Sequence, residues 1–495
     1  MEKKNIVIIG SGFAGLSAAS VLAKEGHSVT LLEKNDQPGG RARIWQQDGF
    51  TFDMGPSWYW MPEVFEKFFN RFGKTTKDFY ELKRLDPSYR IFYEAEEKVD
   101  VPASLEELIK LFEAKEAGSG KRLRSFLADA QYKYQTAMGE YVTRISDSIT
   151  EYFDLKLIIK SFQLQLFQSL RSEVRQKFSH PSLVSLLEFP VLFLGATPDK
   201  TPAMYSMMNY ADLVLGTWYP MGGMNQIIKA MLQLAEEYGV QILVNQEVTK
   251  IDVLNKKAHR IHTTDSIYTA DVVISGSDYN HTEQFLLDEE NRTYDSNYWE
   301  KRTMSPSSLL YYVGVNRKLA NLLHHNLFFD ADFEQHAREI YTDPKWPTSP
   351  LFYVCAASKT DETVAPKGME NLFLLMPLAA GIKDTDSLRE KYFQLMLDRI
   401  EKKTGEPFSE NIIVKRSYCI NDFTKDYHSY KGNAYGLANT LMQTAIFKPK
   451  MISKKVSNLF YTGQLTVPGP GVPPSIISGE MVAREVSNRI KRQIL

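Results

Sequence analysis

One glycine motif near the start constrains the fold of this chain more than any other feature. Gly10-Ser11-Gly12-Phe13-Ala14-Gly15 has the spacing G-x-G-x-x-G and stands between an expected strand, 5–10, and an expected helix, 13–26. A second strand is expected over 28–33, which completes a βαβ unit. In such a unit the first glycine permits a tight turn, the second lets the backbone approach a pyrophosphate, and the third lets the helix pack on the sheet. The helix N-terminus favours phosphate, so the motif predicts a dinucleotide site.

An acidic residue follows at the distance that a ribose-binding carboxylate requires. Glu33 closes the second expected strand, 18 residues after Gly15. Its carboxylate can accept hydrogen bonds from a ribose diol, and an acid at this position argues against a 2′-phosphate. The alternative is a chance glycine-rich turn. At this end of the ligand we expect contacts from Gly10, Gly12, Phe13, Ala14, Gly15, Glu33 and Lys34.

A basic loop comes next, with the sequence Pro38-Gly39-Gly40-Arg41-Ala42-Arg43. Arginine forks suit phosphate oxygens, although a solvated basic loop would have the same composition. With Glu33 and Phe50-Thr51-Phe52-Asp53-Met54-Gly55-Pro56, this loop resembles the superfamily of FAD-containing amine oxidases and carotenoid desaturases. The resemblance implies that the βαβ unit binds the ADP half of FAD. It adds to the expected FAD contacts Gly40, Arg41, Gly55, Pro56, Ser57 and Val248.

The C-terminal part strengthens this resemblance. A strand is expected over 458–462, a turn rich in Gly and Pro over 463–474, and a helix over 475–495. The segment from Asn458 to Ser475 resembles the C-terminal signature of bacterial phytoene desaturases, in which the turn and the helix N-terminus would face the flavin. This implies contacts from Gly463, Gln464, Gly471, Val472 and Pro473. Many flavoproteins have Gly-Asp at this turn, so a role for Gln464 is open.

The resemblance covers essentially the whole chain and implies an α/β fold. We expect a Rossmann-like FAD-binding domain of the glutathione reductase type, with a parallel sheet, and an inserted mixed α+β substrate domain. The FAD-binding domain is expected to comprise 1–95, 220–300 and 415–495. The substrate and membrane-contacting domain is expected to comprise 96–219, which has a helical pattern with few glycines, and 301–414.

A carotenoid is a long hydrocarbon, so its site should be a long apolar tunnel with few polar groups. The expected lining residues are Trp58, Tyr59, Trp60 and Trp218, and further candidates are Met61, Phe189, Leu192, Phe193, Leu194 and Tyr219. For any single residue, ordinary core packing is the alternative.

Composition and apolar patterning limit which partners and which cellular location we expect for this chain. Lys and Arg number 59 against 60 Asp and Glu, so no overall positive charge favours nucleic acid. Two cysteines fit a reducing cytoplasm. No apolar stretch reaches the roughly 20 residues of a membrane helix. A basic amphipathic helix over Asp154–Leu170 could lie on a membrane surface, although it could instead cover the core. We expect a cytoplasmic protein, peripheral on the inner face of the cell membrane.

Desaturation removes a hydride and a proton from adjacent carbons, and the flavin carries the difficult step. The sequence shows no Ser-His-Asp order and no metal-spaced Cys/His cluster, so no metal is expected and no catalytic base is named. His324-His325 is expected to be a surface or structural pair. The segment with Asn421, Asp422, Tyr427 and His428 is a candidate polar region, with a structural loop as the alternative. The resemblance implies that oxygen or a membrane quinone reoxidises the flavin.

The resulting expectation is an FAD-dependent carotenoid desaturase that acts on phytoene. A 1′-hydroxy-carotenoid 3,4-desaturase is the alternative within the same branch, because the motifs overlap heavily. A flavin amine oxidase is more distant, since the segment 467–474 fits desaturases better. A protein that binds prenylated partners without flavin is disfavoured by Glu33, Gly39-Gly40-Arg41 and the turn at Gly471.

Overall fold

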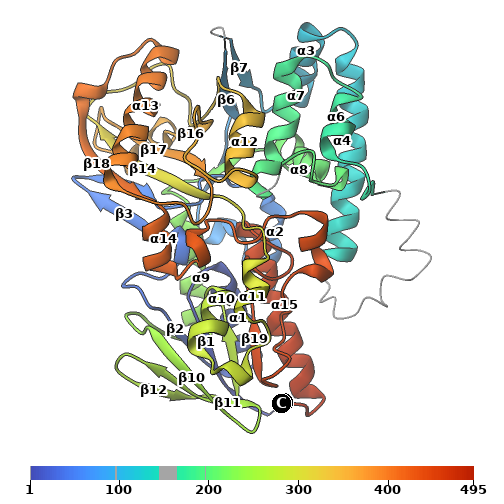
Figure 1. Cartoon of the computed structure of the whole chain (residues 1–495), viewed down its shortest axis with the longest axis vertical. Helices are drawn as coiled ribbons and strands as arrows, with labels where there is room; N and C mark the ends of the chain where they lie inside the picture. The colour runs from blue at the N-terminus through green and yellow to red at the C-terminus, as the bar shows by residue number, and fades with distance from the viewer. Residues whose placement is uncertain (1, 95–96, 144–163, 195–196) are drawn as a thin grey trace.

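Two sheets lie at opposite ends of the molecule, and a group of helices lies beside the upper one (Figure 1). The computed structural model describes residues 2–94, 97–143, 164–194 and 197–495. The lower sheet holds the first strands of the chain together with β19 near its end. The two termini of the chain therefore contribute to one structural unit.

The lower sheet is entirely parallel, with strand order β19-β13-β1-β2-β9. Its central strand β1 is almost fully buried because helices cover the sheet, which is usual for parallel sheets. The strands expected over 5–10, 28–33 and 458–462 are confirmed as β1, β2 and β19. The strands of this sheet are β1 Asn5–Ile9, β2 Ser28–Leu32, β9 Gln241–Leu243, β13 Val272–Ser275 and β19 Leu459–Tyr461.

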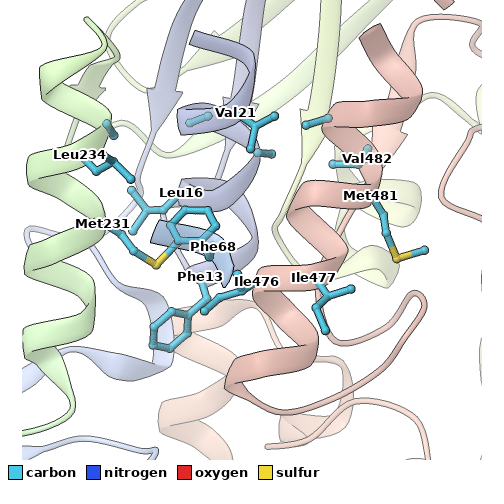
Figure 2. Packing of buried hydrophobic residues seen from close by; sticks show 14 of the residues in the cluster. Phe13, Leu16, Val21, Phe68, Met231, Leu234, Ile476, Ile477, Met481 and Val482 are labelled. Atoms are coloured by element: carbon cyan, nitrogen blue, oxygen red, sulfur yellow. The ribbon is translucent and has the colours of Figure 1, made fainter. Parts of the chain in front are cut away.

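Helix α1 (Phe13–Lys24) is the centre of the lower core, and every residue except Lys24 is buried. It lies between α9 (Asn225–Glu237) and α15 (Val472–Lys491), as Figure 2 shows. A Cβ atom on Gly479 would come within 2.3 Å of the Ala14 carbonyl oxygen. The close packing of α15 on α1 therefore requires glycine at position 479.

Antiparallel elements flank the lower sheet. A three-stranded sheet follows β9 and contains β10 Val248–Leu254, β11 Lys257–Thr263 and β12 Ile267–Thr269. Two smaller pairs connect the two ends of the molecule: β3 Ile44–Gln47 with β4 Phe50–Asp53, and β5 Leu82–Arg84 with β8 Trp218–Pro220. Asp53 ends β4, and its carboxylate accepts the Met224 and Asn225 N–H groups at the start of α9.

The upper sheet has seven strands in the order β18-β14-β17-β16-β15-β6-β7. Its pairs are antiparallel except for β6 with β15. The strands are β6 Tyr89–Tyr93, β7 Lys98–Val101, β14 Ser307–Val315, β15 His325–Phe329, β16 Phe352–Cys355, β17 Glu370–Leu378 and β18 Ile412–Tyr418. Thus β6, from the range 1–95, pairs in the same sheet as strands from 301–414.

Helices cover the upper sheet and extend beyond it (Figure 1). The helices of this part are α3 Leu105–Lys115, α4 Ser119–Thr136, α6 Leu170–Arg175, α7 Pro181–Glu188, α8 Met207–Tyr210, α12 Phe333–Tyr341, α13 Asp386–Thr404 and α14 Ile420–Tyr427. Three further helices pack in the lower part of the molecule: α2 Pro62–Asn70, α10 Tyr279–His281 and α11 Ser296–Glu300. The helical pattern expected between 96 and 219 is confirmed for the described residues, apart from β7 and β8. The expected α/β fold, with a parallel sheet and a second mixed part, is confirmed.

The amphipathic helix expected over Asp154–Leu170 falls largely outside the described residues. Of the range Asp154–Leu170, residues 154–163 lie outside the described part, and 164–167 form a turn. Two of the basic residues near it are held by acids: Arg171 pairs with Glu334 at 2.5 Å, and Arg175 pairs with Glu188 at 2.9 Å. These guanidinium groups are thus engaged within the protein.

Candidate functional site

A cavity of about 190 Å³ lies at the carboxyl ends of β1 and β2. We call it the dinucleotide cavity. Most residues expected to bind the ADP half line it, together with other expected FAD contacts, among which Gly463 and Gln464 were expected near the flavin. Those expected residues are Gly10, Gly12, Phe13, Ala14, Glu33, Lys34, Gly40, Arg41, Val248, Gly463 and Gln464. Gly15 is absent from the lining of this cavity.

The three glycines of the motif differ in backbone angle and in the space around them. Gly10 has a φ angle of 93°, which favours glycine. A Cβ atom on Gly15 would lie 2.0 Å from the Gly10 carbonyl oxygen, whereas a Cβ atom on Gly12 would meet no atom within 4 Å. Gly15 is therefore fixed by packing within the protein. Gly12 leaves open space beside the first turn of α1.

The N-terminus of α1 is available to an anion. Gly12 caps the helix without a side-chain hydrogen bond, and no acidic residue stands in the first turn. The first N–H groups of a helix lack intrahelical partners and carry the positive end of the helix dipole. Open space beside these donors matches the pyrophosphate of a dinucleotide.

Glu33 organises the loops around the ribose position. One carboxylate oxygen accepts from the Ser11 N–H at 3.0 Å and from the Ser11 hydroxyl at 2.5 Å. The other accepts from the backbone N–H and the side-chain amide of Asn35, at 2.9 and 3.0 Å. The structure thus gives Glu33 a second task that the sequence did not reveal, which is to join the glycine turn to the loop after β2.

Arg41 lies where the dinucleotide cavity meets a larger one. Its Nη2 atom donates to the Ser429 hydroxyl at 2.5 Å, and its guanidinium lies 5.0 Å from the centre of the Tyr427 ring. Burial lowers the pKa of Arg41 from its ordinary value, while Asp278 among other groups acts in the opposite direction. Burial also raises the pKa of Asp278, which lines the dinucleotide cavity, to about 6. Asp278 was not predicted, because its segment carries no motif.

The larger cavity has a volume of about 610 Å³ and is lined mainly by apolar side chains. We call it the apolar cavity. It shares with the dinucleotide cavity the residues Phe13, Arg41, Tyr427, Gln464 and Ser475. The two spaces therefore adjoin, as the halves of one extended ligand site would.

The remaining expected FAD contacts lie around the apolar cavity. Gly55, Pro56 and Ser57 line it on one side, and Gly471, Val472 and Pro473 line it on another. The last three begin α15, three residues earlier than the sequence predicts, because Pro473 and Pro474 are accommodated in the first helical turn. The positive end of a helix 20 residues long thus faces this cavity.

Some of the expected substrate residues line the apolar cavity. Trp58, Trp60 and Met61 do so. Sequence reasoning missed many others, because they come from helices, from strands of the upper sheet and from a loop, whose patterns only indicate burial. Among them are Met138, Met204, Met207, Met208, Leu310, Leu375 and Tyr435.

Other expected lining residues lie elsewhere. Tyr59 is fully buried against Phe65, with its hydroxyl 2.9 Å from that of Tyr80. The indole of Trp218 donates to the Leu215 carbonyl. Phe189 and Tyr219 are core residues outside the lining, and the side chains of 192–194 are not described. Tyr59 forms an isolated β-bridge with Trp218, whereas its neighbours Trp58 and Trp60 line the cavity.

Exposed apolar side chains stand near the residues that line the apolar cavity. Phe167 is 73% exposed, Met442 64% and Phe447 41%. Phe447 itself lines the cavity, as do Leu164 and Leu166. No helix among the described residues is both long and apolar enough to cross a membrane.

A chain of polar groups leads from the apolar cavity into the upper sheet. Ser57 and Tyr353 both line the cavity, and their hydroxyl oxygens lie 3.0 Å apart. The same Tyr353 oxygen lies 2.6 Å from Nδ1 of His325. His324 and His325 are both buried, which excludes the surface position but not the structural pair that was the other expected possibility. Cys355 on β16 completes a cluster whose nitrogen and sulfur atoms lie within 4.8 Å of one another.

The four residues of the expected polar region around α14 do not form one site in the structure. Asn421 bonds to Asp384, and Asp422 pairs with Arg389. His428 lines the dinucleotide cavity, where its Nε2 atom lies 2.8 Å from a carboxylate oxygen of Glu247. Only Tyr427, of these four, reaches the apolar cavity.

The hydrogen-bond donors and the open space of the two cavities fit FAD. An open helix N-terminus, a glycine with free space beside it and a buried guanidinium are arranged along one cavity, and a helix dipole faces the adjoining apolar space. Phosphates require the first group of features. A reduced isoalloxazine ring carries negative charge, which the α15 N-terminus would stabilise.

Comparison with known proteins agrees with this reading of the site. The family model described as flavin containing amine oxidoreductase matches residues 13–487. A carotenoid 3,4-desaturase of Haloarcula japonica is 40% identical over 485 residues, which cover 98% of each chain. A zeta-carotene-forming phytoene desaturase of Myxococcus xanthus is 31% identical over 98% of this chain and 94% of its own.

Solved structures share the fold at low identity. An oxidoreductase from Methanosarcina mazei superimposes with a TM-score of 0.60 at 18% identity, over 97% of this chain and 100% of its own. Cyclohexylamine oxidase from Brevibacterium oxydans does so with a TM-score of 0.58 at 12% identity, over 99% and 100%.

Proposed function

Because the chain belongs to the family of flavin-containing amine oxidoreductases, we propose that it is an FAD-dependent carotenoid desaturase that introduces the 3,4 double bond. The cofactor is FAD, and the enzyme is an oxidoreductase of carotenoid CH–CH bonds. The sequence-based expectation placed phytoene first. The greater identity to a 3,4-desaturase than to a phytoene desaturase, 40% against 31%, favours the alternative.

The apolar cavity carries the proposal, and one polar residue that lines it supports an oxygen-bearing substrate. Asn439 lines the cavity, and its buried side-chain oxygen has no hydrogen-bond partner among the described residues. A buried acceptor without a partner costs about 1–3 kcal/mol. The hydroxyl of a hydroxylated carotenoid could donate to it, whereas phytoene is a pure hydrocarbon.

A buried lysine lies beside the same site. Lys448 and Asn439 both come within 4 Å of the point where a side chain on Gly469 would begin. Burial lowers the pKa of Lys448 to about 8, and its Nζ atom has no partner among the described residues. A substrate oxygen at Asn439 would therefore have a second polar group close by.

FAD, when bound, supplies the two-electron acceptor for the hydride. The protein's own residues bind and orient the polyene, since Trp58, Trp60 and Met61 provide apolar walls, and they exclude water from the reacting carbons. The Gly55–Ser57 segment and the start of α15 approach the space from different sides. Oxygen or a membrane quinone is proposed as the final electron acceptor.

We also propose that the protein docks on a membrane surface through Phe167, Met442 and Phe447. The substrate is dissolved in lipid, and these exposed apolar side chains stand beside residues that line the apolar cavity. Burial of one such side chain in lipid contributes about 1.5–3 kcal/mol. A peripheral position on the inner membrane face follows from this proposal.

Pigment analysis tests the function. Cells that accumulate a hydroxylated carotenoid with a saturated 3,4 bond, and cells that accumulate phytoene, would each receive the chain. We expect the first pigment to lose two hydrogens at the 3,4 position and the second to stay unchanged. The Asn439→Leu variant should lower the conversion of the hydroxylated pigment while it retains FAD. Conversion of phytoene alone would contradict the 3,4 assignment.

A further inference from the structure

Desaturation releases a proton, and the apolar cavity has no obvious group to receive it. Among its lining residues in the described part of the chain, there is no aspartate, glutamate or histidine. The polar groups that line it are hydroxyls, amides, indoles and the Arg41 guanidinium. A guanidinium is permanently protonated and cannot accept the proton.

The Ser57–Tyr353–His325 chain connects the cavity to a basic nitrogen. The Tyr353 hydroxyl lies at the cavity wall, 3.0 Å from the Ser57 oxygen and 2.6 Å from His325 Nδ1. The imidazole is held in place because it stacks on Trp58, which also lines the cavity, with ring centroids 4.1 Å apart. The other ring nitrogen, Nε2, has no partner among the described residues.

We propose that Tyr353 and His325 form the proton relay of the desaturation, with Tyr353 as the group that meets the substrate. The proposal rests on carotenoid desaturation, but not on the position of the new double bond. Tyr353 is the catalytic residue in this account, and His325 is a positioning residue that acts through it.

The relay balances the reaction. One carbon loses a hydride with both bonding electrons, for which FAD is the acceptor. The C–H electron pair of the adjacent carbon becomes the new π bond, and its proton moves to the Tyr353 oxygen. The Tyr353 proton moves at the same time to His325 Nδ1, so the tyrosine remains neutral and the imidazole becomes positively charged.

A weak base is sufficient for this step. Loss of the hydride leaves positive charge on the polyene, which makes the adjacent C–H group strongly acidic. Burial and the neighbouring His324 hold the pKa of His325 well below its ordinary value, so the imidazole is neutral and can accept a proton. His324 contacts His325 and bonds to the half-buried Thr360 at 2.7 Å. The proton can therefore pass from His325 through His324 toward Thr360.

Another phenol at the cavity is less suitable. Tyr427 also lines the cavity, and its hydroxyl and the Asp426 carboxylate both accept from Arg43 Nη2. However, the Arg41 and Arg43 guanidinium groups lie 5.0 and 5.2 Å from the Tyr427 ring centre, and Arg43 pairs with Asp426 at 2.6 Å. Two cations oppose the arrival of a proton there. Within the described part of the chain, no Lys or Arg bonds to His325.

The test uses holoenzyme in carotenoid-containing vesicles, with whichever carotenoid the wild type converts. Product formation is measured under anaerobic single-turnover conditions in H2O and in D2O. For the wild type we expect a slower rate in D2O, because an exchangeable proton moves from Tyr353 to His325. Tyr353→Phe and His325→Gln should each slow product formation by about 10²-fold, within the range of general base catalysis, and should lose the solvent isotope effect.

Tyr93→Phe is the matched control, because it removes a buried phenol of β6 that donates to the Ser182 carbonyl, outside the cavity. It should keep both rate and isotope effect. FAD content and thermal unfolding check that each variant is folded. If His325→Gln does not fold, the Tyr353→Phe variant alone tests the relay. A Tyr353→Phe holoenzyme with the wild-type rate and isotope effect would overturn the relay, whichever double bond the enzyme forms.

Discussion

The imidazole of His325 lies parallel to the indole of Trp58, with ring centroids 4.1 Å apart and planes 7° apart. Trp58 comes from the segment after β4, and His325 begins β15 in the upper sheet. The contact therefore joins the segment that resembles a flavin-binding motif to the sheet that closes the apolar cavity. Both the shape of the cavity and the proposed proton relay depend on it.

Replacing Trp58 should weaken carotenoid binding without loss of FAD. Trp58→Leu removes an aromatic wall of the apolar cavity and leaves the dinucleotide cavity unchanged. We expect KM for the carotenoid to rise at least several-fold at an unchanged flavin-to-protein ratio. Trp45→Leu is the control, since Trp45 stacks on Phe52 outside the cavity. An equal rise in KM for both variants would contradict this assignment.

The glycine motif offers a test of where FAD binds. Gly12→Val places a side chain into open space beside α1, so the protein should fold but purify without yellow colour. Gly15→Ala places a Cβ atom 2.0 Å from the Gly10 carbonyl, so it should lower thermal stability itself. Flavin absorbance and thermal unfolding separate the two effects. A Gly12→Val protein with full FAD content would show that the pyrophosphate lies elsewhere.

Membrane docking can be measured by flotation with lipid vesicles. The double variant Phe167→Ser, Phe447→Ser should reduce binding more than tenfold, because two apolar side chains would no longer enter lipid. Phe285 and Ile413 are also exposed, at 69% and 49%, but are not among the residues of the apolar cavity. Their replacement by Ser should leave binding intact. Equal losses for both pairs would exclude a specific docking surface.

Asp212 should make stability depend on pH. Burial raises its pKa to about 7 from 3.8, although Tyr89 donates to it at 2.7 Å. The folded protein therefore holds this proton at pH values where the unfolded chain has lost it. The contribution is fully present below about pH 4, is lost as pH rises to about 7 and is constant above, a change of at most about 4 kcal/mol.

The Asp212→Asn variant tests that dependence. Its thermal midpoint relative to the wild type should increase between pH 4 and pH 8, since the amide cannot ionise. An unchanged difference between the two proteins across this range would show that the Asp212 pKa is not raised.

The N-terminal and C-terminal ends of the site were predictable because their chemistry is local. The positions of Gly10, Gly12 and Glu33 follow from one βαβ unit, and the structure places all three at one cavity. The tail was predictable for the same reason, since a glycine turn and a helix start stand together in sequence. The pattern did not show that α15 begins at Val472, because two prolines normally indicate a loop.

The substrate side depends on contacts between distant segments. Tyr353 and Ser57 are 296 positions apart, and no periodicity links them. His325 and Cys355 face each other only because β15 and β16 pair in that register. Four aromatic or large residues in a row, 58–61, predicted a segment that lines the substrate site. The pattern could not show that Trp58, Trp60 and Met61 line the cavity while Tyr59 is buried in the core.

The most direct test of the proposed function is a competition experiment with purified holoenzyme. Vesicles would contain equal amounts of phytoene and of a hydroxylated carotenoid with a saturated 3,4 bond, and products would be separated and identified over time. The account predicts a product with a new 3,4 double bond from the hydroxylated carotenoid and little change in phytoene, with the preference reduced in Asn439→Leu. Preferential desaturation of phytoene, unaffected by that substitution, would contradict it.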